Sequence, residues 1–256
     1  MIKAAFFDID GTLLSFKTHR IPASAQQVLD SFHERGIACV IATGRPTYQM
    51  PDWLFDLGWD AYITLSGQHC FDASGVYRSC PIDPDDVAVI VDQVAQGRYD
   101  SLCMQGENSF VNRLSERVVT AGSNAGIVYH EEPFEHAFDA PVYQFCAFVD
   151  PADEHIVTDA VSHSLITRWC DLFCDIIPAN GGKDLGVAAT LERLGIDVSE
   201  AIAFGDGEND LSMFAAVGTS VAMGNAQDTV KAAATYVTTV VDDDGIYNAA
   251  KHFGLV

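Results

Sequence analysis

The chain has 256 residues, 48% of them hydrophobic, and a formal net charge of −22 at pH 7. This length allows one large domain or two modest ones with a real hydrophobic core, and the apolar fraction excludes a disordered chain. The negative charge excludes nucleic acid and anionic membranes as general partners, because both are polyanions.

The acidic residues are concentrated in the middle of the chain. Residues 80–179 hold 17 acidic side chains, 4 basic ones and no lysine, whereas residues 1–79 hold 8 acidic and 6 basic ones. This shift in composition predicts an inserted module, residues 80–179, between the two halves of one domain, residues 1–79 and 180–256. The alternative interpretation is that the charge only keeps the surface soluble.

The cysteines and the apolar segments indicate a cytoplasmic protein. The chain has seven cysteines and no Cys-x-x-Cys pair, which predicts free thiols in a reducing compartment. Asp8 interrupts the first apolar segment, so neither a signal peptide nor a membrane span is expected. The oligomeric state stays open at this point.

Strands and helices alternate in the first part of the chain. Residues 3–9, 37–42 and 61–65 predict buried strands, and residues 22–35 and 46–57 predict the helices between them. This alternation predicts an α/β fold, with a doubly wound (Rossmann-like) parallel sheet as the core domain and helices on both of its faces.

The same alternation returns after residue 180, and the middle of the chain has a different pattern. The later helices are predicted at residues 183–194, 210–217 and 226–234 and after Asp244, and the strands at residues 201–204, 220–223 and 236–238. In the middle, helices are predicted at residues 85–96 and 153–164, and strands at residues 101–104, 143–149 and 167–173. The inserted module is therefore predicted to be an α+β cap domain.

Acidic residues follow two of the predicted core strands. Asp8 and Asp10 come directly after the first strand, and Asp206 and Asp210 follow the strand at residues 201–204. Ligands of doubly wound sheets bind at the carboxyl ends of the strands, where these carboxylates would meet. Two carboxylates about 4 Å apart repel by about 4 kcal/mol at an effective dielectric constant of 20, which a cation or a shared proton relieves. Carboxylate oxygens suit Mg²⁺.

Two further segments offer groups that can bind phosphate. Thr43 and Gly44 end the second strand, and a hydroxyl beside a glycine amide is a good phosphate donor, although a Thr-Gly pair alone is a common turn. Lys183 opens a helix, where its charge opposes the helix dipole, which suggests that the ammonium has another partner.

As a set, these segments resemble the motifs of the haloacid dehalogenase (HAD) superfamily, in particular its Cof-type phosphatases. The matching residues are Asp8-Ile-Asp10-Gly-Thr12, Thr43-Gly44-Arg45, Lys183 and Gly205-Asp206-x-x-Asn209-Asp210. Met223-Gly224-Asn225-Ala226 and Asp244-Gly245 also resemble the end of that subfamily. One departure is Ser66-Gly67-Gln68, where many relatives have Asn-Gly.

The resemblance implies a role for the acidic residues. Asp8 would be the nucleophile that forms an aspartyl-phosphate, and Asp10 would be the general acid and base. Asp8, the backbone carbonyl of Asp10, and Asp206 would hold Mg²⁺.

It also implies which residues bind the phosphoryl group. Thr43, Gly44, Lys183 and Asn209 would contact its oxygens. Three residues would support the site without contacting the phosphate: Thr12, Arg45 and Asp210. Asp210 would do so by orienting Lys183 or a metal-bound water.

These observations predict a Mg²⁺-dependent phosphomonoester hydrolase that acts on a small cytosolic phosphate ester, such as a sugar phosphate. A phosphomutase of the same superfamily is the alternative. A receiver domain would need only half this length, and the phosphate loop of nucleotide-binding kinases, G-x-x-x-x-G-K-[ST], is absent from the sequence.

The charge of the insert adds a further hypothesis about the leaving group. An insert with this net negative charge is predicted to disfavour leaving groups that carry additional negative charge. Three arginines of the insert could contact the substrate, but they are predicted to be partners in surface ion pairs: Arg113, Arg117 and Arg168.

Overall fold

The computed structural model describes every residue except 169, and the chain divides into two compact units. We call them the core unit and the insert unit. The core unit comprises Met1–Arg45, Gln49–Ser79 and Gly182–Val256, and the insert unit comprises Pro46–Tyr48 and Cys80–Gly181. Within the described chain, no helix combines the length and the apolar character needed to cross a membrane.

The core unit is built on one eight-stranded sheet with the order β13-β12-β11-β1-β2-β3-β4-β5. The first six strands in this order run parallel, and β4 and β5 are antiparallel to their neighbours. The α/β fold with a parallel core sheet is therefore confirmed. The strands are β1 (Ala4–Phe7), β2 (Ala38–Ala42), β3 (Ala61–Thr64), β4 (His69–Asp72), β5 (Gly75–Ser79), β11 (Ala201–Gly205), β12 (Thr219–Ala222) and β13 (Tyr236–Val237).

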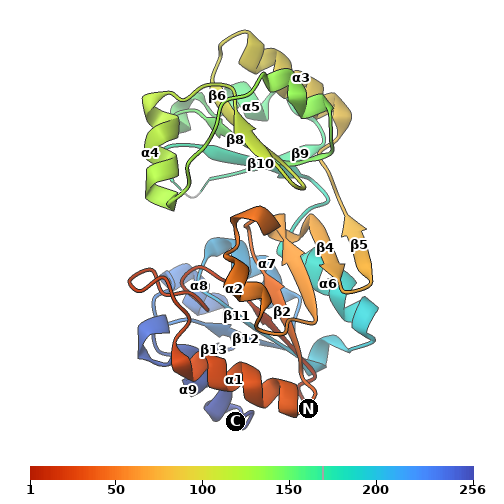
Figure 1. Ribbon diagram of the computed structural model, residues 1–256, viewed down its shortest axis with the longest axis vertical. Helices are drawn as coiled ribbons and strands as arrows, with labels where there is room; N and C mark the ends of the chain where they lie inside the picture. Colours follow the sequence, from red (N-terminus) through yellow and green to blue (C-terminus); the bar gives the residue numbers. More distant parts are fainter. Residues whose placement is uncertain (169) are drawn as a thin grey trace. The chain divides into compact units, whose positions relative to one another are not determined.

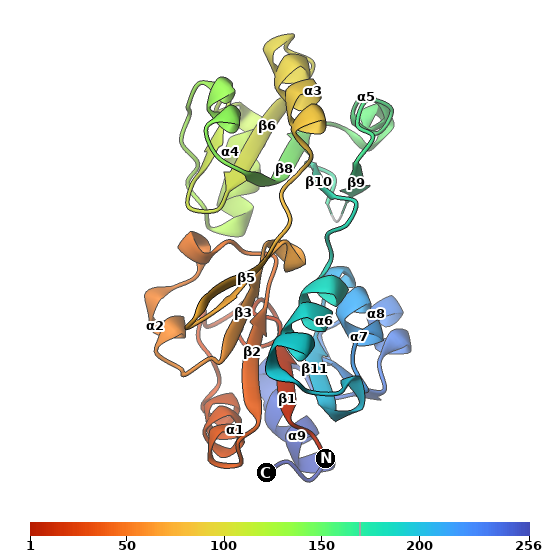
Figure 2. The same cartoon turned by 90° about the vertical axis from the view of Figure 1, so that its right-hand side faces the viewer.

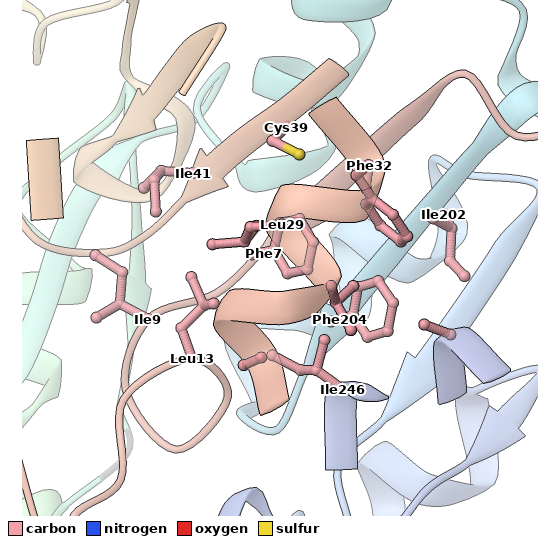
Figure 3. Packing of buried hydrophobic residues seen from close by; sticks show 14 of the residues in the cluster. Phe7, Ile9, Leu13, Leu29, Phe32, Cys39, Ile41, Ile202, Phe204 and Ile246 are labelled. Carbon is pink, nitrogen blue, oxygen red and sulfur yellow. The ribbon is translucent and has the colours of Figure 1, made fainter. Parts of the chain in front are cut away.

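Alternating side chains of β1 pack into two hydrophobic cores, one on each face of the sheet. Phe7 packs on the face covered by α1 (Ala23–Glu34) and α9 (Gly245–His252), where its ring stacks on Phe204 with centroids 5.0 Å apart (Figures 1 and 3). All four residues of β1 are fully buried, which explains why its sequence is continuously apolar rather than alternating.

Three helices cover the other face of the sheet. Phe6 packs there against side chains of α6 (Lys183–Leu194), α7 (Leu211–Ala215) and α8 (Asp228–Ala233), which lie together in Figure 2. Helix α6 has the bounds that the sequence predicts, and it ends at Gly195, whose φ of 67° suits a glycine.

The insert unit has its own antiparallel sheet and its own core. The sheet has the order β7-β6-β8-β10-β9, and α3 and α5 contribute to the core beneath it. The elements are α3 (Pro84–Ala95), β6 (Asp100–Gln105), β7 (Ser109–Val111), α4 (Glu116–Ala125), β8 (Val142–Phe148), α5 (His155–Thr158), β9 (Ser164–Thr167) and β10 (Cys174–Pro178). This is an α+β arrangement, as predicted.

Two predictions in the insert unit are wrong, and buried polar contacts explain both. The helix predicted at residues 153–164 is only the short α5, because the backbone amides of Ser162 and His163 donate instead to the carboxylate of Asp86. The strand predicted at residues 167–173 is also wrong, because β9 ends at Thr167 and β10 begins only at Cys174. Between them the guanidinium of Arg168 donates to the carbonyls of Cys170 and Phe173. Residue 169 of that prediction lies outside the described residues.

The segment from β2 to β5 also differs from prediction in two places. The helix predicted at residues 46–57 is a 3₁₀ turn at Thr47–Gln49 and the short helix α2 (Asp52–Phe55), separated at Pro51, which lacks an amide hydrogen. The hairpin β4–β5 was not predicted. In its turn the amide of Ser74 donates to the side chain of Asp72, and turns of this kind are typical of aspartate.

The position of β1 in the sheet determines where the candidate site lies. Strand β1 lies between β2, which follows it in the chain, and β11, which comes more than 190 residues later. The chain therefore reverses its winding direction at β1, and the carboxyl ends of β1, β2 and β11 meet at one edge of the sheet. Ligands of such sheets bind at this point.

Candidate active site

Asp8 follows β1 directly and continues its pairing with β11. Its amide donates to the carbonyl of Phe204 at 3.0 Å, and its side chain is only 6% exposed. Burial raises the pKa of Asp8 well above its ordinary value, and the carboxylates of Asp210 and Asp206 add to this rise, whereas Lys183 opposes it. The negative charge of this site is therefore unfavourable unless cations accompany it.

Lys183 is the cation on which the buried carboxylates converge. Its Nζ donates to Oδ1 of Asp8 at 2.7 Å and to Oδ1 of Asp210 at 2.6 Å, and the residue is 1% exposed. Burial lowers the pKa of Lys183, but the attraction of Asp210 and Asp8 outweighs burial, so its pKa lies above the ordinary value. This explains a lysine at the start of α6, where the dipole alone disfavours it.

Asp210 is fixed from the other side by backbone amides. Its Oδ2 accepts hydrogen bonds from the amides of Asp206 and Gly207 at 2.9 and 3.0 Å. Gly205 makes room for it, since a Cβ there would lie 2.5 Å from the Asp210 carboxylate carbon. Asp210 therefore connects Lys183 to the backbone of the loop after β11. Its role in orienting Lys183 or a metal-bound water stays a prediction.

Asp206 is held by two side chains from distant parts of the chain. Its Oδ1 accepts from the hydroxyl of Thr12 at 2.8 Å, and its Oδ2 accepts from Nδ2 of Asn225 at 3.0 Å. Burial raises the pKa of Asp206 to about 6. Gly11 approaches so closely that a Cβ on it would lie 2.2 Å from Oδ2 of Asp206.

Asn225 is a site residue to which the sequence analysis assigned no role. Besides Asp206 it binds the carbonyl of Gly11 at 2.9 Å and accepts from the amide of Val241 at 3.0 Å. It thereby connects the loops after β1, β11 and β13. Its motif, Met223-Gly224-Asn225-Ala226, was the signal that could have revealed this role.

Three carboxylates lie close enough to share a cation. One oxygen each of Asp8, Asp206 and Asp210 lies within 4.8 Å of the others. Hard carboxylate oxygens fit Mg²⁺, so the donor set agrees with the predicted metal. The Asp10 carboxylate is not a member of this group; its predicted contribution through the backbone carbonyl stays a prediction.

The carboxylate of Asp10 instead forms a bidentate ion pair with Arg45. Nε of Arg45 donates to Oδ2 at 2.6 Å and Nη2 donates to Oδ1 at 2.7 Å, while Nη1 donates to the carbonyl of Gln49 at 2.8 Å. Arg45 therefore supports a predicted catalytic residue.

Two of the predicted phosphate-binding residues, Thr43 and Gly44, follow β2, and Asn209 lies near Gly44. The Oγ1 of Thr43 accepts from the amide of Arg45 at 3.1 Å, which leaves the hydroxyl hydrogen free to donate elsewhere. A Cβ on Gly44 would lie 3.3 Å from Oγ of Ser66 and 3.9 Å from Nδ2 of Asn209. The absence of a side chain at Gly44 thus leaves open space between a hydroxyl and an amide.

The loop after β3 supports this arrangement in a strained conformation. Leu65 and Ser66 have φ values of 52° and 55°, which only glycine adopts without cost. The next residue, Gly67, has a φ of 97°, and a Cβ on it would lie 2.0 Å from the carbonyl oxygen of Gly182, beside Lys183. The packing of Gly67 on Gly182 holds the loop in place.

The site thus centres on an aspartate that forms an ion pair with a buried lysine, and further carboxylates lie beside it. It is located where the parallel sheet reverses its winding direction. These features fit an enzyme with a parallel α/β core sheet that acts on a phosphate group. The chain belongs to the haloacid dehalogenase-like hydrolases, whose family model matches residues 5–249.

Known proteins similar to this chain include phosphatases. The HAD subclass IIB sugar phosphatase BT4131 is 35% identical, with a TM-score of 0.89 over 99% of this chain and 100% of that one. The phosphatase BT1666 from Bacteroides thetaiotaomicron is 34% identical, with a TM-score of 0.92 over 100% of this chain and 96% of that one. YkrA from Bacillus subtilis (strain 168) is 30% identical over 99% of this chain and 98% of its own length. The protein is therefore a phosphatase of the HAD superfamily, of the Cof type.

Proposed function

We propose that the protein is a Mg²⁺-dependent phosphomonoester hydrolase that acts in the cytoplasm on a small phosphate ester, such as a sugar phosphate, through an aspartyl-phosphate on Asp8. The observation that carries this proposal is the ion pair between Lys183 and Asp8, 2.7 Å long and buried, with Asp206 beside it. The sugar phosphatase BT4131, similar over nearly the whole chain, supports the substrate class. The seven free thiols support the compartment.

In this mechanism the free carboxylate oxygen of Asp8 attacks phosphorus. Lys183 binds Oδ1 and so presents Oδ2 as the attacking atom. The bond from phosphorus to the ester oxygen breaks, and its electron pair stays on that oxygen, which takes a proton from Asp10. A water then attacks the phosphorus of the aspartyl-phosphate and gives a proton to Asp10, and the bond to Asp8 breaks, which releases phosphate.

The remaining residues position the phosphoryl group and neutralise its charge. Thr43, the amide of Gly44, and Asn209 would donate to its oxygens, and Lys183 would contribute a positive charge. When bound, Mg²⁺ would neutralise charge on the phosphoryl oxygens and on Asp8 and Asp206, which would hold it with the carbonyl of Asp10.

The Arg45 ion pair has a consequence for the proposed acid and base. Both oxygens of Asp10 accept from Arg45, and each oxygen keeps a second lone-pair site at which it can hold or exchange a proton. Arg45 would therefore orient the carboxyl group, as bidentate guanidinium–carboxylate pairs do.

The test is release of inorganic phosphate from p-nitrophenyl phosphate and from sugar phosphates, with Mg²⁺ and with a chelator. We expect Mg²⁺-dependent release that Asp8→Asn abolishes and that Asp56→Asn, an exposed acid of the core unit, leaves unchanged. Activity of Asp8→Asn equal to the parent would refute the proposal. Conversion of a sugar 1-phosphate into the 6-phosphate without free phosphate would instead identify a phosphomutase.

A further inference from the structure

Ser66 places a hydroxyl beside the predicted phosphate-binding residues of the core unit, although the sequence analysis assigned it no role. A Cβ on Gly44 would lie 3.3 Å from Oγ of Ser66 and 3.9 Å from Nδ2 of Asn209. Gly44 and Asn209 are both residues that would contact the phosphoryl oxygens in the proposed mechanism. An oxygen atom in the space beside Gly44 would therefore lie near the hydroxyl of Ser66 as well as the amide of Asn209.

Backbone hydrogen bonds fix the position of Ser66 relative to Gly44. The amide of Ser66 donates to the carbonyl of Thr43 at 3.0 Å, and the amide of Leu65 donates to the carbonyl of Arg45 at 3.1 Å. The two acceptors directly precede and follow Gly44, so the loop after β3 is bound to the segment after β2 on both sides of this glycine. The hydroxyl of Ser66 is thus held in place before any ligand arrives, which is what efficient binding of a reacting group requires.

The conformation of Ser66 is one that glycine would adopt more easily. Its φ and ψ are 55° and 34°, and the preceding Leu65 also has a positive φ, of 52°. This left-handed region is unfavourable for a residue with a Cβ, and strained residues of this kind cluster at functional sites. Relative to glycine, serine adds only a Cβ and a hydroxyl. The strain therefore directs attention to what the hydroxyl does.

The hydroxyl of Ser66 is available to a ligand. Ser66 is half-buried, and its Oγ makes no hydrogen bond to another residue that the structure describes. A hydroxyl can donate one hydrogen bond and carries no charge. In a site that already holds the carboxylates of Asp8, Asp206 and Asp210, a neutral donor can bind an anionic oxygen without adding to the repulsion.

We propose that Ser66 is a further phosphate-binding residue, whose hydroxyl donates to an oxygen of the transferred phosphoryl group in the space between Gly44 and Asn209. This inference rests on the proposed function and adds a substrate-binding residue to it. The contact is assigned to the phosphoryl group, not to the leaving group, because Gly44 and Asn209 are the residues that Ser66 adjoins.

The first test measures binding of inorganic phosphate without turnover. The midpoint of thermal unfolding of the full-length protein is followed against phosphate concentration, at fixed Mg²⁺ and fixed ionic strength. The parent is compared with Ser66→Ala and Ser66→Gly, which both lack the hydroxyl. The Kd for phosphate should rise at least about tenfold in both variants, as expected when a hydrogen bond to a charged group is lost.

The same titration separates the hydroxyl from the backbone strain. Without phosphate, Ser66→Gly should unfold at a higher temperature than Ser66→Ala, because glycine adopts a φ of 55° without strain. The two variants should thus differ in stability and agree in phosphate affinity, whereas a merely structural role would move both properties together. Ser74→Ala, which changes an exposed serine of the β4–β5 turn, is the control and should keep the Kd of the parent.

The second test compares two esters that share only the phosphoryl group. Ser66→Ala should lower kcat/KM for p-nitrophenyl phosphate and for glucose 6-phosphate by the same factor, because the lost contact is with the group that both esters carry. Unequal factors would assign Ser66 to the leaving group and overturn the inference.

Two results of the phosphate titration would also overturn it. One is a Kd that is unchanged in Ser66→Ala and Ser66→Gly, and the other is a Kd that rises only in the less stable of the two. Failure of the proposed function looks different: neither ester then releases phosphate in a reaction that depends on Asp8. The phosphate titration needs no turnover, so it still decides the role of Ser66 in that case.

Discussion

Arg45 binds Asp10 through two parallel hydrogen bonds of 2.6 and 2.7 Å, while a carbonyl of the next turn holds its third nitrogen. Asp10 is therefore positioned by a group that lies outside the buried network of Asp8 and Lys183. The two networks can be disturbed separately, which makes their contributions to catalysis and to stability separable by experiment.

Arg45→Ala is expected to lower kcat by about tenfold to a hundredfold, because Asp10 would then no longer be oriented and would contribute less to the rate as general acid and base. Stability should change by no more than about 1 kcal/mol, since this ion pair is partly exposed. The measurements are steady-state phosphate release and urea unfolding. Arg193→Ala removes a comparable exposed pair with Asp72 and should leave kcat unchanged; equal effects of the two variants would contradict the role of Arg45.

Lys183→Met should affect stability and activity together. The substitution leaves the buried carboxylates of Asp8 and Asp210 without a cation, and breaking a buried pair in this way costs about 3–5 kcal/mol. Urea unfolding measures the loss, and phosphate release should disappear. Lys251→Met, at the exposed end of α9, is the control and should lie within about 0.5 kcal/mol of the parent. A stable Lys183→Met protein would mean that the pair contributes little to the fold.

Gly67→Ala tests the contact that holds the strained loop. The new Cβ would lie 2.0 Å from the carbonyl oxygen of Gly182, and φ is 97°. We expect a loss above about 3 kcal/mol, compared with about 1 kcal/mol for Gly36→Ala, whose φ is also positive but whose Cβ would meet open space. Thermal unfolding of both variants measures the difference. Equal losses would show that only the backbone conformation matters at Gly67.

The sequence alone was sufficient for the parts of the fold that local patterns encode. The parallel strands β1, β2 and β11 are continuously apolar, and α6 is bounded by Gly182 and Gly195, so these elements could be predicted. Asp8 and Asp206 could be singled out because they follow such strands, and Lys183 because it opens α6. The structure brings these three residues together from segments far apart in the chain.

The features of the fold and the site that could not be predicted depend on contacts between residues far apart in the chain, which no local sequence pattern contains. The amides of Ser162 and His163 bind Asp86, more than 70 residues earlier, and this contact ends α5 early. Asn225 joins three loops of the site, and its motif singles it out without indicating which residues it contacts. The ion pair of Asp10 with Arg45 likewise required the ends of β1 and β2 to be placed side by side.

Mg²⁺ is expected to stabilise the core unit, because it would relieve the repulsion among Asp8, Asp206 and Asp210. A ligand at a hundredfold excess over its Kd adds about 2.7 kcal/mol to the free energy of unfolding, a rise in Tm of several degrees. Differential scanning fluorimetry with and without Mg²⁺ measures this without any substrate. Asp206→Ala should abolish the shift and Asp228→Asn should retain it; a shift that survives Asp206→Ala would place the metal elsewhere.

The insert unit is expected to lose stability in acid through Asp86. This buried carboxylate accepts from the amides of Ser162 and His163 and from the hydroxyl of Ser164, at 2.7–2.9 Å. Burial would raise the pKa of Asp86, but these hydrogen bonds outweigh burial and hold the pKa below its ordinary value. The folded state thus binds this proton more weakly than the unfolded state does. The stabilisation is complete above the unfolded pKa of about 4 and disappears as pH falls through the lower folded value.

Asp86→Asn isolates this contribution from the other carboxylates of an acidic protein. Asparagine keeps one acceptor and adds an amide NH₂ group whose donors the site cannot satisfy, so we expect a loss of about 2–3 kcal/mol at pH 7 that narrows towards pH 3. Urea unfolding of the parent and the variant from pH 7 to pH 3, followed by a probe in the insert unit, measures that difference. Asp85→Asn, the exposed neighbour in the first turn of α3, should cost about 0.5 kcal/mol. A loss for Asp86→Asn that is the same at pH 3 and pH 7 would show that the ionised carboxylate is not what connects α3 to β9.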